Sequence, residues 1–137
     1  MSKAVVDAIK TRLYLDQTAG SVYDAVSGRI YHLQSPENGT LPLVVFGVAS
    51  SSPSPNFDGS TTETLRVEFT IYSQAFESGA AAALGIDDKL LACLEGQILA
   101  PTGYDRLTVR CEQRGAASMV EDAVSVTSVY RCVGTRT

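Results

Sequence analysis

A strict alternation of apolar and polar residues over 64–73 constrains the fold of this chain more than any other feature. The segment reads Thr-Leu-Arg-Val-Glu-Phe-Thr-Ile-Tyr-Ser, so every second side chain from Leu65 to Ile71 is apolar. A period of two is typical of a β-strand with one buried face and one solvated face. Antiparallel sheets commonly leave one face open in this way. The segment therefore predicts an antiparallel strand whose polar face is uncovered.

Other segments predict the strands that surround it. Residues 43–48 are apolar on both faces, as expected of a central strand, and residues 30–33 predict a short strand before them. Residues 106–112 alternate in the same way as 64–73. The last strand spans 124–132, where the apolar positions change from even to odd numbers, and this change predicts a bulge.

Two segments carry apolar residues at the three- to four-residue spacing of a helix face. They are residues 2–16, followed by a short turn or helix at 22–26, and a segment from Ser78 or Gly79 to about Glu95. On the second helix, Asp87 and Asp88 are predicted to point outward as part of a solvated face. The stripes predicted to face the core are Val5, Val6, Ile9 and Leu13 on the first helix, and Ala83, Ile86, Leu90, Cys93 and Leu94 on the second.

The order of these elements predicts an α+β fold. We expect two layers, with a mostly antiparallel four- to five-stranded sheet and two helices packed on one face. The 137 residues are the size of one ordinary domain, so residues 1–137 are predicted to form a single domain. The polar face of the sheet then stays available for a partner.

Residues 50–62 interrupt this pattern with polar and turn-forming residues. Twelve of the thirteen are Ser, Pro, Asn, Asp, Gly or Thr. The composition predicts a long flexible loop, and loops of this length in compact domains are usually functional or disordered. Phe57 is the exception, and two interpretations stay open for it. It folds back onto the domain, or it anchors a partner together with Asn56 and Asp58.

The charge of the chain disfavours sequence-independent binding to nucleic acid. Asp plus Glu number 15 and Lys plus Arg number 11, which gives a net charge of −4. Phosphate binding normally needs a basic surplus. No apolar run approaches the ~20 residues of a membrane span, so no membrane partner is expected. The first residues also lack the apolar stretch of a secretory signal peptide.

The residues that usually carry enzyme chemistry are sparse. Cys93, Cys111 and Cys132 fall at apolar-periodic positions without Cys-x-x-Cys spacing, so we predict buried free thiols. His32 is the only histidine, and a partly exposed strand position is predicted for it. The sequence contains no phosphate-binding glycine loop, metal-binding histidine pair or nucleophile motif. We expect no catalytic residue, no cofactor and no metal.

The polar faces of two predicted strands form the main candidate site. Each face combines arginine with glutamate at alternate positions, so cross-strand ion pairs form if the strands are neighbours. Arg114 continues the even spacing of the second face and is expected on it. One interpretation is a solvated face with weak ion pairs; the other is a subunit interface, which makes a ring if a heterologous contact closes. The candidate residues are Arg66, Glu68 and Thr70 on one strand, Arg106, Arg110 and Glu112 on the other, and Asn56, Phe57 and Asp58 in the polar segment.

Several motifs follow one another in an order that adds a further prediction. Val-Val-Asp-Ala-Ile-Lys-Thr-Arg-Leu at 5–13 precedes Gly-Arg-Ile-Tyr at 28–31. Leu-Pro-Leu-Val-Val-Phe at 41–46 and Leu-Arg-Val-Glu-Phe-Thr-Ile-Tyr-Ser at 65–73 follow, and then a helix rich in Ala, Ile and Leu and two strands. In these motifs the chain resembles the tail terminator or tail-completion proteins of long-tailed bacteriophages and related phage-like particles, which are minor tail proteins of the head-to-tail joining type. The long polar segment and residues 116–122 depart from the family pattern.

The resemblance implies a structural role in the virion without enzyme activity. Proteins of this family form hexameric rings on the head-proximal end of the tail tube, where they end tube polymerisation and offer a surface to the head or neck. The implied partners are further copies of the chain in a homo-hexamer, the tail tube protein, and a head-completion or neck protein. DNA passes through the lumen of the ring without specific binding. Assembly is implied to take place in the cytoplasm of the bacterial host.

Other functions stay open on the sequence. One is a different neck component, such as a head-closure or adaptor protein, which would follow the twelve-fold order of the portal instead of the six-fold order of the tube. Another is a small enzyme, which would need a deep pocket with strongly perturbed carboxylates. A monomeric ligand-binding domain is the third.

Overall fold

The computed structural model describes residues 3–34, 39–74, 79–120 and 123–136. Two of the predictions concern residues outside the described ranges. One is the start of the predicted helices, at residues 2 and 78, and the other is residues 121–122 of the segment 116–122 that departs from the family pattern. The elements in chain order are α1 (Lys3–Leu15), α2 (Val22–Ala25), β1 (Ile30–His32), β2 (Leu43–Pro55), β3 (Thr61–Gln74), α3 (Gly79–Leu94), β4 (Ile98–Leu99), β5 (Tyr104–Arg114), β6 (Ser118–Val120) and β7 (Ala123–Arg136).

The strands form one mixed sheet. Its order is β1-β2-β3-β7-β5-β4, and β6 pairs with β7 beside this path. The pair β1–β2 is parallel, and the other pairs are antiparallel. The predicted α+β class is confirmed, but four to five strands and two helices are too few, because the described residues form seven strands and three helices. The additional strands β4 and β6 have two and three residues, too few for a periodic pattern to show.

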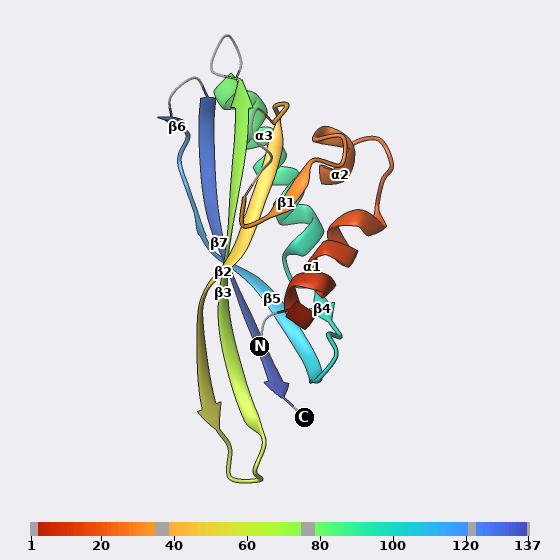
Figure 1. Ribbon diagram of the computed structural model, residues 1–137, viewed down its shortest axis with the longest axis vertical. Helices are drawn as coiled ribbons and strands as arrows, with labels where there is room; N and C mark the ends of the chain where they lie inside the picture. Colours follow the sequence, from red (N-terminus) through yellow and green to blue (C-terminus); the bar gives the residue numbers. More distant parts are fainter. Residues whose placement is uncertain (1–2, 35–38, 75–78, 121–122, 137) are drawn as a thin grey trace.

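All three helices lie on one side of the sheet (Figure 1). Helix α3 packs against β3, β7 and β5, and α1 and α2 pack against α3. None of the helices in the described ranges has the length and apolar character to cross a bilayer. Helix α3 ends where Gly96 takes a φ of +74°, the left-handed conformation that glycine adopts most easily after a helix. The predicted stripes are buried at Val5, Val6, Ile9, Leu13, Ala83, Ile86, Leu90 and Leu94, and Cys93 is half-buried.

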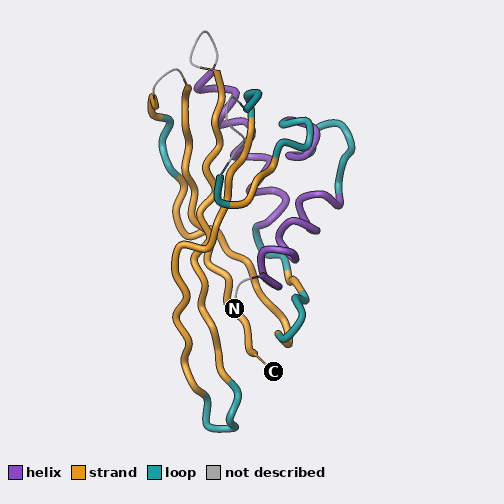
Figure 2. The backbone as a smooth tube through the Cα atoms, viewed as in Figure 1, coloured by secondary structure: helices purple, strands orange, loops and turns teal. Residues whose placement is uncertain are grey.

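The prediction of a long flexible loop at 50–62 is wrong. Its first six residues belong to β2 and its last two to β3, and only the turn Asn56 to Ser60 connects them. Strand β1 covers only a short stretch of β2, so the second half of β2 runs along an edge of the sheet. Proline is tolerated on an edge strand, which explains Pro53 and Pro55. Figure 2 shows the resulting β2–β3 hairpin extending past the helices.

The predicted bulge in the last strand is also wrong. The register of β3 and β7 is continuous from Thr61 opposite Arg136 to Gln74 opposite Ala123. Ser128 occupies a core-facing position of β7 with 0% exposure, which is why the apolar pattern changes there. The register shift lies instead in β5, where it has a direct effect on the candidate site.

Candidate functional site

The sheet face opposite the helices carries a row of three arginines. Arg66 of β3 lies opposite Arg131 of β7, and Arg131 lies opposite Arg110 of β5. All three side chains are exposed. Directly opposed residues on neighbouring strands have Cβ atoms about 4.5–5.5 Å apart, and like charges at this distance repel. The row therefore concentrates positive charge in the middle of the open face.

Two of the three arginines have carboxylate partners. Arg66 Nε lies 3.1 Å from Glu112 Oε1, and Arg110 Nη1 lies 3.3 Å from Glu95 Oε1. Arg131 forms no ion pair with a carboxylate of the described ranges. The central positive charge of the row is thus left to solvent, and an acidic side chain of a partner would complement it.

The other strand residues of the candidate site lie away from this row. Glu68 and Thr70 lie further along the same face of β3, and Thr70 Oγ1 is 3.2 Å from Thr127 Oγ1. Arg106 is exposed beside a register irregularity in β5. Strands β3 and β5 are not neighbours, because β7 runs between them. The contact between Arg66 and Glu112 therefore spans β7.

The three turn residues of the candidate site form a separate place at the end of the hairpin. Asn56, Phe57 and Asp58 lie in the turn between β2 and β3, which is the lowest part of the molecule in Figure 1. Phe57 has a relative exposure of 113%. It therefore does not fold back onto the domain, and its contact with a partner stays a prediction.

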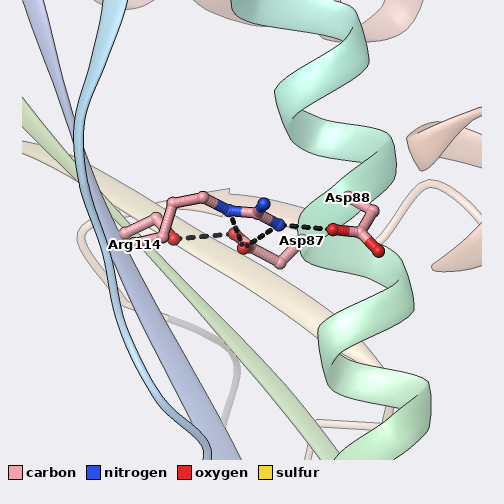
Figure 3. Close-up of polar contacts among 4 residues, drawn as sticks. Asp87, Asp88 and Arg114 are labelled. Carbon is pink, nitrogen blue, oxygen red and sulfur yellow. Dashed lines mark hydrogen bonds and ion pairs between the residues drawn. The ribbon is translucent and has the colours of Figure 1, made fainter.

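A β-bulge in β5 places Arg114 on the helix side of the sheet. The prediction that Arg114 shares the face of Arg106 and Arg110 is therefore wrong. The register shifts between Cys111 and Gln113, so one additional residue enters the strand and the alternation reverses after it. The reversal directs Arg114 toward α3, where it meets two carboxylates (Figure 3).

Asp87 is buried at 1% exposure, so the prediction of a solvated side chain is wrong for it, whereas Asp88 is exposed as predicted. Ser128 Oγ donates a hydrogen bond of 2.7 Å to Asp87 Oδ1, and Arg114 Nε donates one of 2.9 Å to Oδ2. Arg114 also donates to Asp88. These hydrogen bonds raise the pKa of Arg114, so its positive charge is permanent. The cluster connects α3 to β5 and β7, which is a structural role.

Glu63 is a second buried carboxylate, at 1% exposure near the β2–β3 turn. It accepts hydrogen bonds from Tyr104 Oη at 2.8 Å and Ser51 Oγ at 3.2 Å, and Arg136 Nη1 lies 3.5 Å from its Oε2. Burial, together with the bond to Glu63, raises the pKa of Tyr104 to about 12. These contacts join β2, β3, β5 and β7. They show why a segment as polar as 50–62 is held in the sheet.

The cysteines and the histidine lie in places that do not favour catalysis. Cys132 is buried, as predicted for all three cysteines, but Cys93 and Cys111 are half-buried. Burial raises the pKa of each thiol, that of Cys132 to about 12, so each stays in the unreactive protonated form at neutral pH. His32 is half-buried in β1, with its ring 5.5 Å from that of Phe46. In the described part of the chain, no three His, Cys, Asp or Glu side chains gather as a metal site.

Arg131 lies on the open face but is not among the candidate residues predicted from the sequence. A signal for it exists, because Arg131 stands between Tyr130 and Cys132, and both of these are buried. The bulge that was wrongly predicted near residue 128 assigned the wrong face to the residues after it, so this alternation was missed. The positions of Glu63 and Asp87 also carried a signal, because Glu63 continues the odd-numbered buried face of β3 and Asp87 lies between Ala83 and Leu90 on the buried stripe of α3. Their charge outweighed it, because the partners that compensate the charge lie on other elements.

The sequence matches no protein-family model and no curated protein. The fold is similar to solved structures. One is a chain of the virion of native gene transfer agent particle, with a TM-score of 0.77 and 18% sequence identity, covering 94% of this chain and 92% of that one. A second, named only by a sequence identifier, has a TM-score of 0.63 and 10% identity, covering 98% of this chain and 95% of that one. The chain therefore shares its fold, over nearly its whole length, with a chain of a gene transfer agent virion.

Proposed function

We propose that this chain is a structural protein of a phage-like virion. The observation that carries the proposal is the fold shared with a chain of a gene transfer agent virion, which extends over 94% of this chain. The sequence motifs that resemble tail terminator proteins support the same role and do not depend on the fold. The open sheet face and the hairpin turn offer surfaces for the contacts that such a role requires.

In this proposal the chain forms a homo-hexameric ring on the head-proximal end of the tail tube. The ring ends tube polymerisation and gives a head-completion or neck protein a surface for attachment. It is part of the tail and neck of the virion and is assembled in the cytoplasm of the bacterial host. A ring requires a heterologous contact, in which two different surfaces of one subunit meet. The candidate surfaces are the arginine row and the hairpin turn.

The charges support protein contacts and not DNA binding. Arg66 and Arg110 are held by carboxylates of the same chain. Among the residues that the structure describes, no carboxylate pairs with Arg131, so a carboxylate of a partner can. The chain as a whole has a net charge of −4. A ring of such chains repels DNA phosphates on balance, so DNA can pass through its lumen without specific binding. No catalytic activity is part of the proposal.

The test is assembly of the tail tube with and without this chain. Tail tube protein of the same particle is polymerised alone and then with increasing amounts of the chain, and tube lengths and ends are measured by electron microscopy. The proposal expects shorter tubes with a six-fold ring at one end. A twelve-fold ring that ignores tubes would favour another neck component. Tubes of unchanged length without a ring would overturn the proposal.

A further inference from the structure

The hairpin turn holds Phe57 outward and places a negative charge beside it. Ser60 donates two hydrogen bonds to Asp58 Oδ1, from its backbone nitrogen at 3.0 Å and from its Oγ at 2.6 Å. Asn56 Nδ2 donates to Ser60 Oγ at 3.0 Å. The bonds from Ser60 lower the pKa of Asp58, so its carboxylate is ionised at neutral pH. The turn thus presents an aromatic ring next to a fixed anion.

A groove of 740 Å³ lies between α1 and the β4 edge of the sheet. Ala4 and Ala8 of α1 are small side chains in its wall, so they leave space beside the strand. Leu15 and Ile98 line the groove with exposures of 69% and 60%. Grooves of about 300–1,000 Å³ with mostly apolar walls are the usual size of binding sites, and an aromatic side chain fits such a space well.

Two cations, Lys3 and Arg12, line the groove against one carboxylate, Asp7. Asp16 lies near enough to Arg12 for its pKa to be lowered by that charge, after the larger effect of its hydrogen bonds from Thr18. Lys3 is paired with Asp7 at 2.7 Å. Arg12 donates from Nε to the carbonyl oxygen of Cys93 at 3.1 Å, but it forms no ion pair with a carboxylate among the described residues. An anion that enters the groove beside an apolar ring would complement Arg12. The hairpin turn combines these two features.

The turn and the groove lie toward opposite edges of the same sheet. In the strand order β1-β2-β3-β7-β5-β4, the hairpin is formed by the second and third strands and the groove borders the last. Figure 1 shows the turn at the bottom and α1 and β4 on the right. A contact between them therefore joins two copies side by side. Such a heterologous contact repeats from copy to copy and makes a ring where its rotation closes.

We infer that Phe57 of one copy inserts into the α1–β4 groove of the neighbouring copy, with Asp58 facing Arg12. This inference rests on the proposed ring and names its subunit contact. The ring of Phe57 buries apolar surface against Leu15 and Ile98, as central aromatic anchors do in protein interfaces. The ion pair with Arg12 fixes the direction of the contact.

Photocrosslinking tests the contact directly. Benzoylphenylalanine is placed at position 57, and the full chain is irradiated at the highest soluble concentration, alone and with the tail tube protein. Crosslinked peptides are identified by mass spectrometry. The inference expects crosslinks to residues 3–15 or 97–102 of a second copy. The same probe at Met119, which is 62% exposed, is the matched control and should not reach these residues. Crosslinks from position 57 to another surface or to the tail tube protein, or no crosslinks, would overturn the inference.

A charge exchange gives a second, independent readout. Phe57→Ala should weaken self-association about 30-fold, the loss typical of an aromatic anchor. Arg12→Asp and Asp58→Arg should each weaken it about 10-fold, and the two together should restore it. A ring that forms equally well with Phe57→Ala would refute the inference and leave the proposed function standing. If the unchanged protein neither self-associates nor shortens tubes, the proposed function itself fails.

Discussion

Replacing Asp87 with alanine perturbs the contact between α3 and the sheet at one buried group. The carboxylate is 1% exposed and accepts hydrogen bonds from Ser128 Oγ at 2.7 Å and Arg114 Nε at 2.9 Å. Alanine removes both bonds. The Ser128 hydroxyl stays buried at 0% exposure without this acceptor. Arg114 is 40% exposed and keeps Asp88, so its guanidinium returns to water more easily.

The size of the loss follows from these contacts. A hydrogen bond to a charged group contributes about 1.5–3 kcal/mol, and an orphaned buried hydroxyl costs about 1–3 kcal/mol. The lost charge attraction adds little, because Arg114 is 40% exposed and keeps Asp88. We therefore expect Asp87→Ala to lower the free energy of unfolding by about 4 kcal/mol. Asp88→Ala is the matched control, because that carboxylate is 69% exposed and its loss should cost less than about 1 kcal/mol.

The effect of Ser128→Ala should change sign with the background. In the unchanged protein it removes a donor to Asp87 and should cost about 1–2 kcal/mol, whereas beside Asp87→Ala it removes an orphaned hydroxyl and should stabilise by about 1 kcal/mol. Urea unfolding followed by circular dichroism measures both, since the chain has no tryptophan. With a slope of about 2 kcal/mol per molar urea, a loss of 4 kcal/mol moves the midpoint by about 2 M. Equal costs of Ser128→Ala in both backgrounds would refute the reasoning.

Three further predictions concern the rest of the molecule. Tyr104→Phe removes a hydrogen bond to a buried carboxylate and should cost about 1.5–3 kcal/mol at pH 7. The pKa of Tyr104 is raised from 10.0 to about 12 in the folded chain, so the free energy of unfolding falls as pH rises through this window. Urea unfolding at each pH should show that the free energy of unfolding of Tyr104→Phe falls less over the same window. Arg66→Glu with Arg110→Glu should reduce the assembled mass in light scattering, while Lys89→Glu on the exposed side of α3 should not; equal masses would remove the arginine row from the interface. Deleting residues 51–60 removes the strand partner of the first half of β3 and should lower the Tm in circular dichroism, so an unchanged Tm would contradict the hairpin.

The parts of the fold that the sequence predicts well are those whose signal is local. The alternation around Phe69 predicts β3, and the apolar spacing around Ile9 and Leu90 predicts α1 and α3, because one buried face imposes one period. The additional strands β4 and β6 are too short to carry a period. The parallel pairing of β1 depends on a neighbouring strand and leaves no mark on three residues.

The wrong predictions share a different cause. In each, contacts with residues far away in the sequence override the structure that the local sequence favours. Residues 50–62 read as a loop, but Glu63 and its contacts hold the polar strand in the sheet. The sequence predicts a surface position for Asp87, but the bulge in β5 places Arg114 within hydrogen-bond distance of it. For the candidate site, the sequence predicts which strand face carries Arg66 and which carries Arg110. The alignment of Arg66 and Arg110 with Arg131 was not predictable, because it depends on β7 lying between their strands.

The mass of the protein in solution, alone and with the tail tube protein, tests the central claim most directly. Light scattering should detect a species of about 87 kDa in at least one condition, six times the 14.5 kDa of the chain, as a closed six-membered ring requires. Substoichiometric amounts should also stop tube growth. A species of 14.5 kDa in both conditions, with tubes that grow as before, would contradict the account.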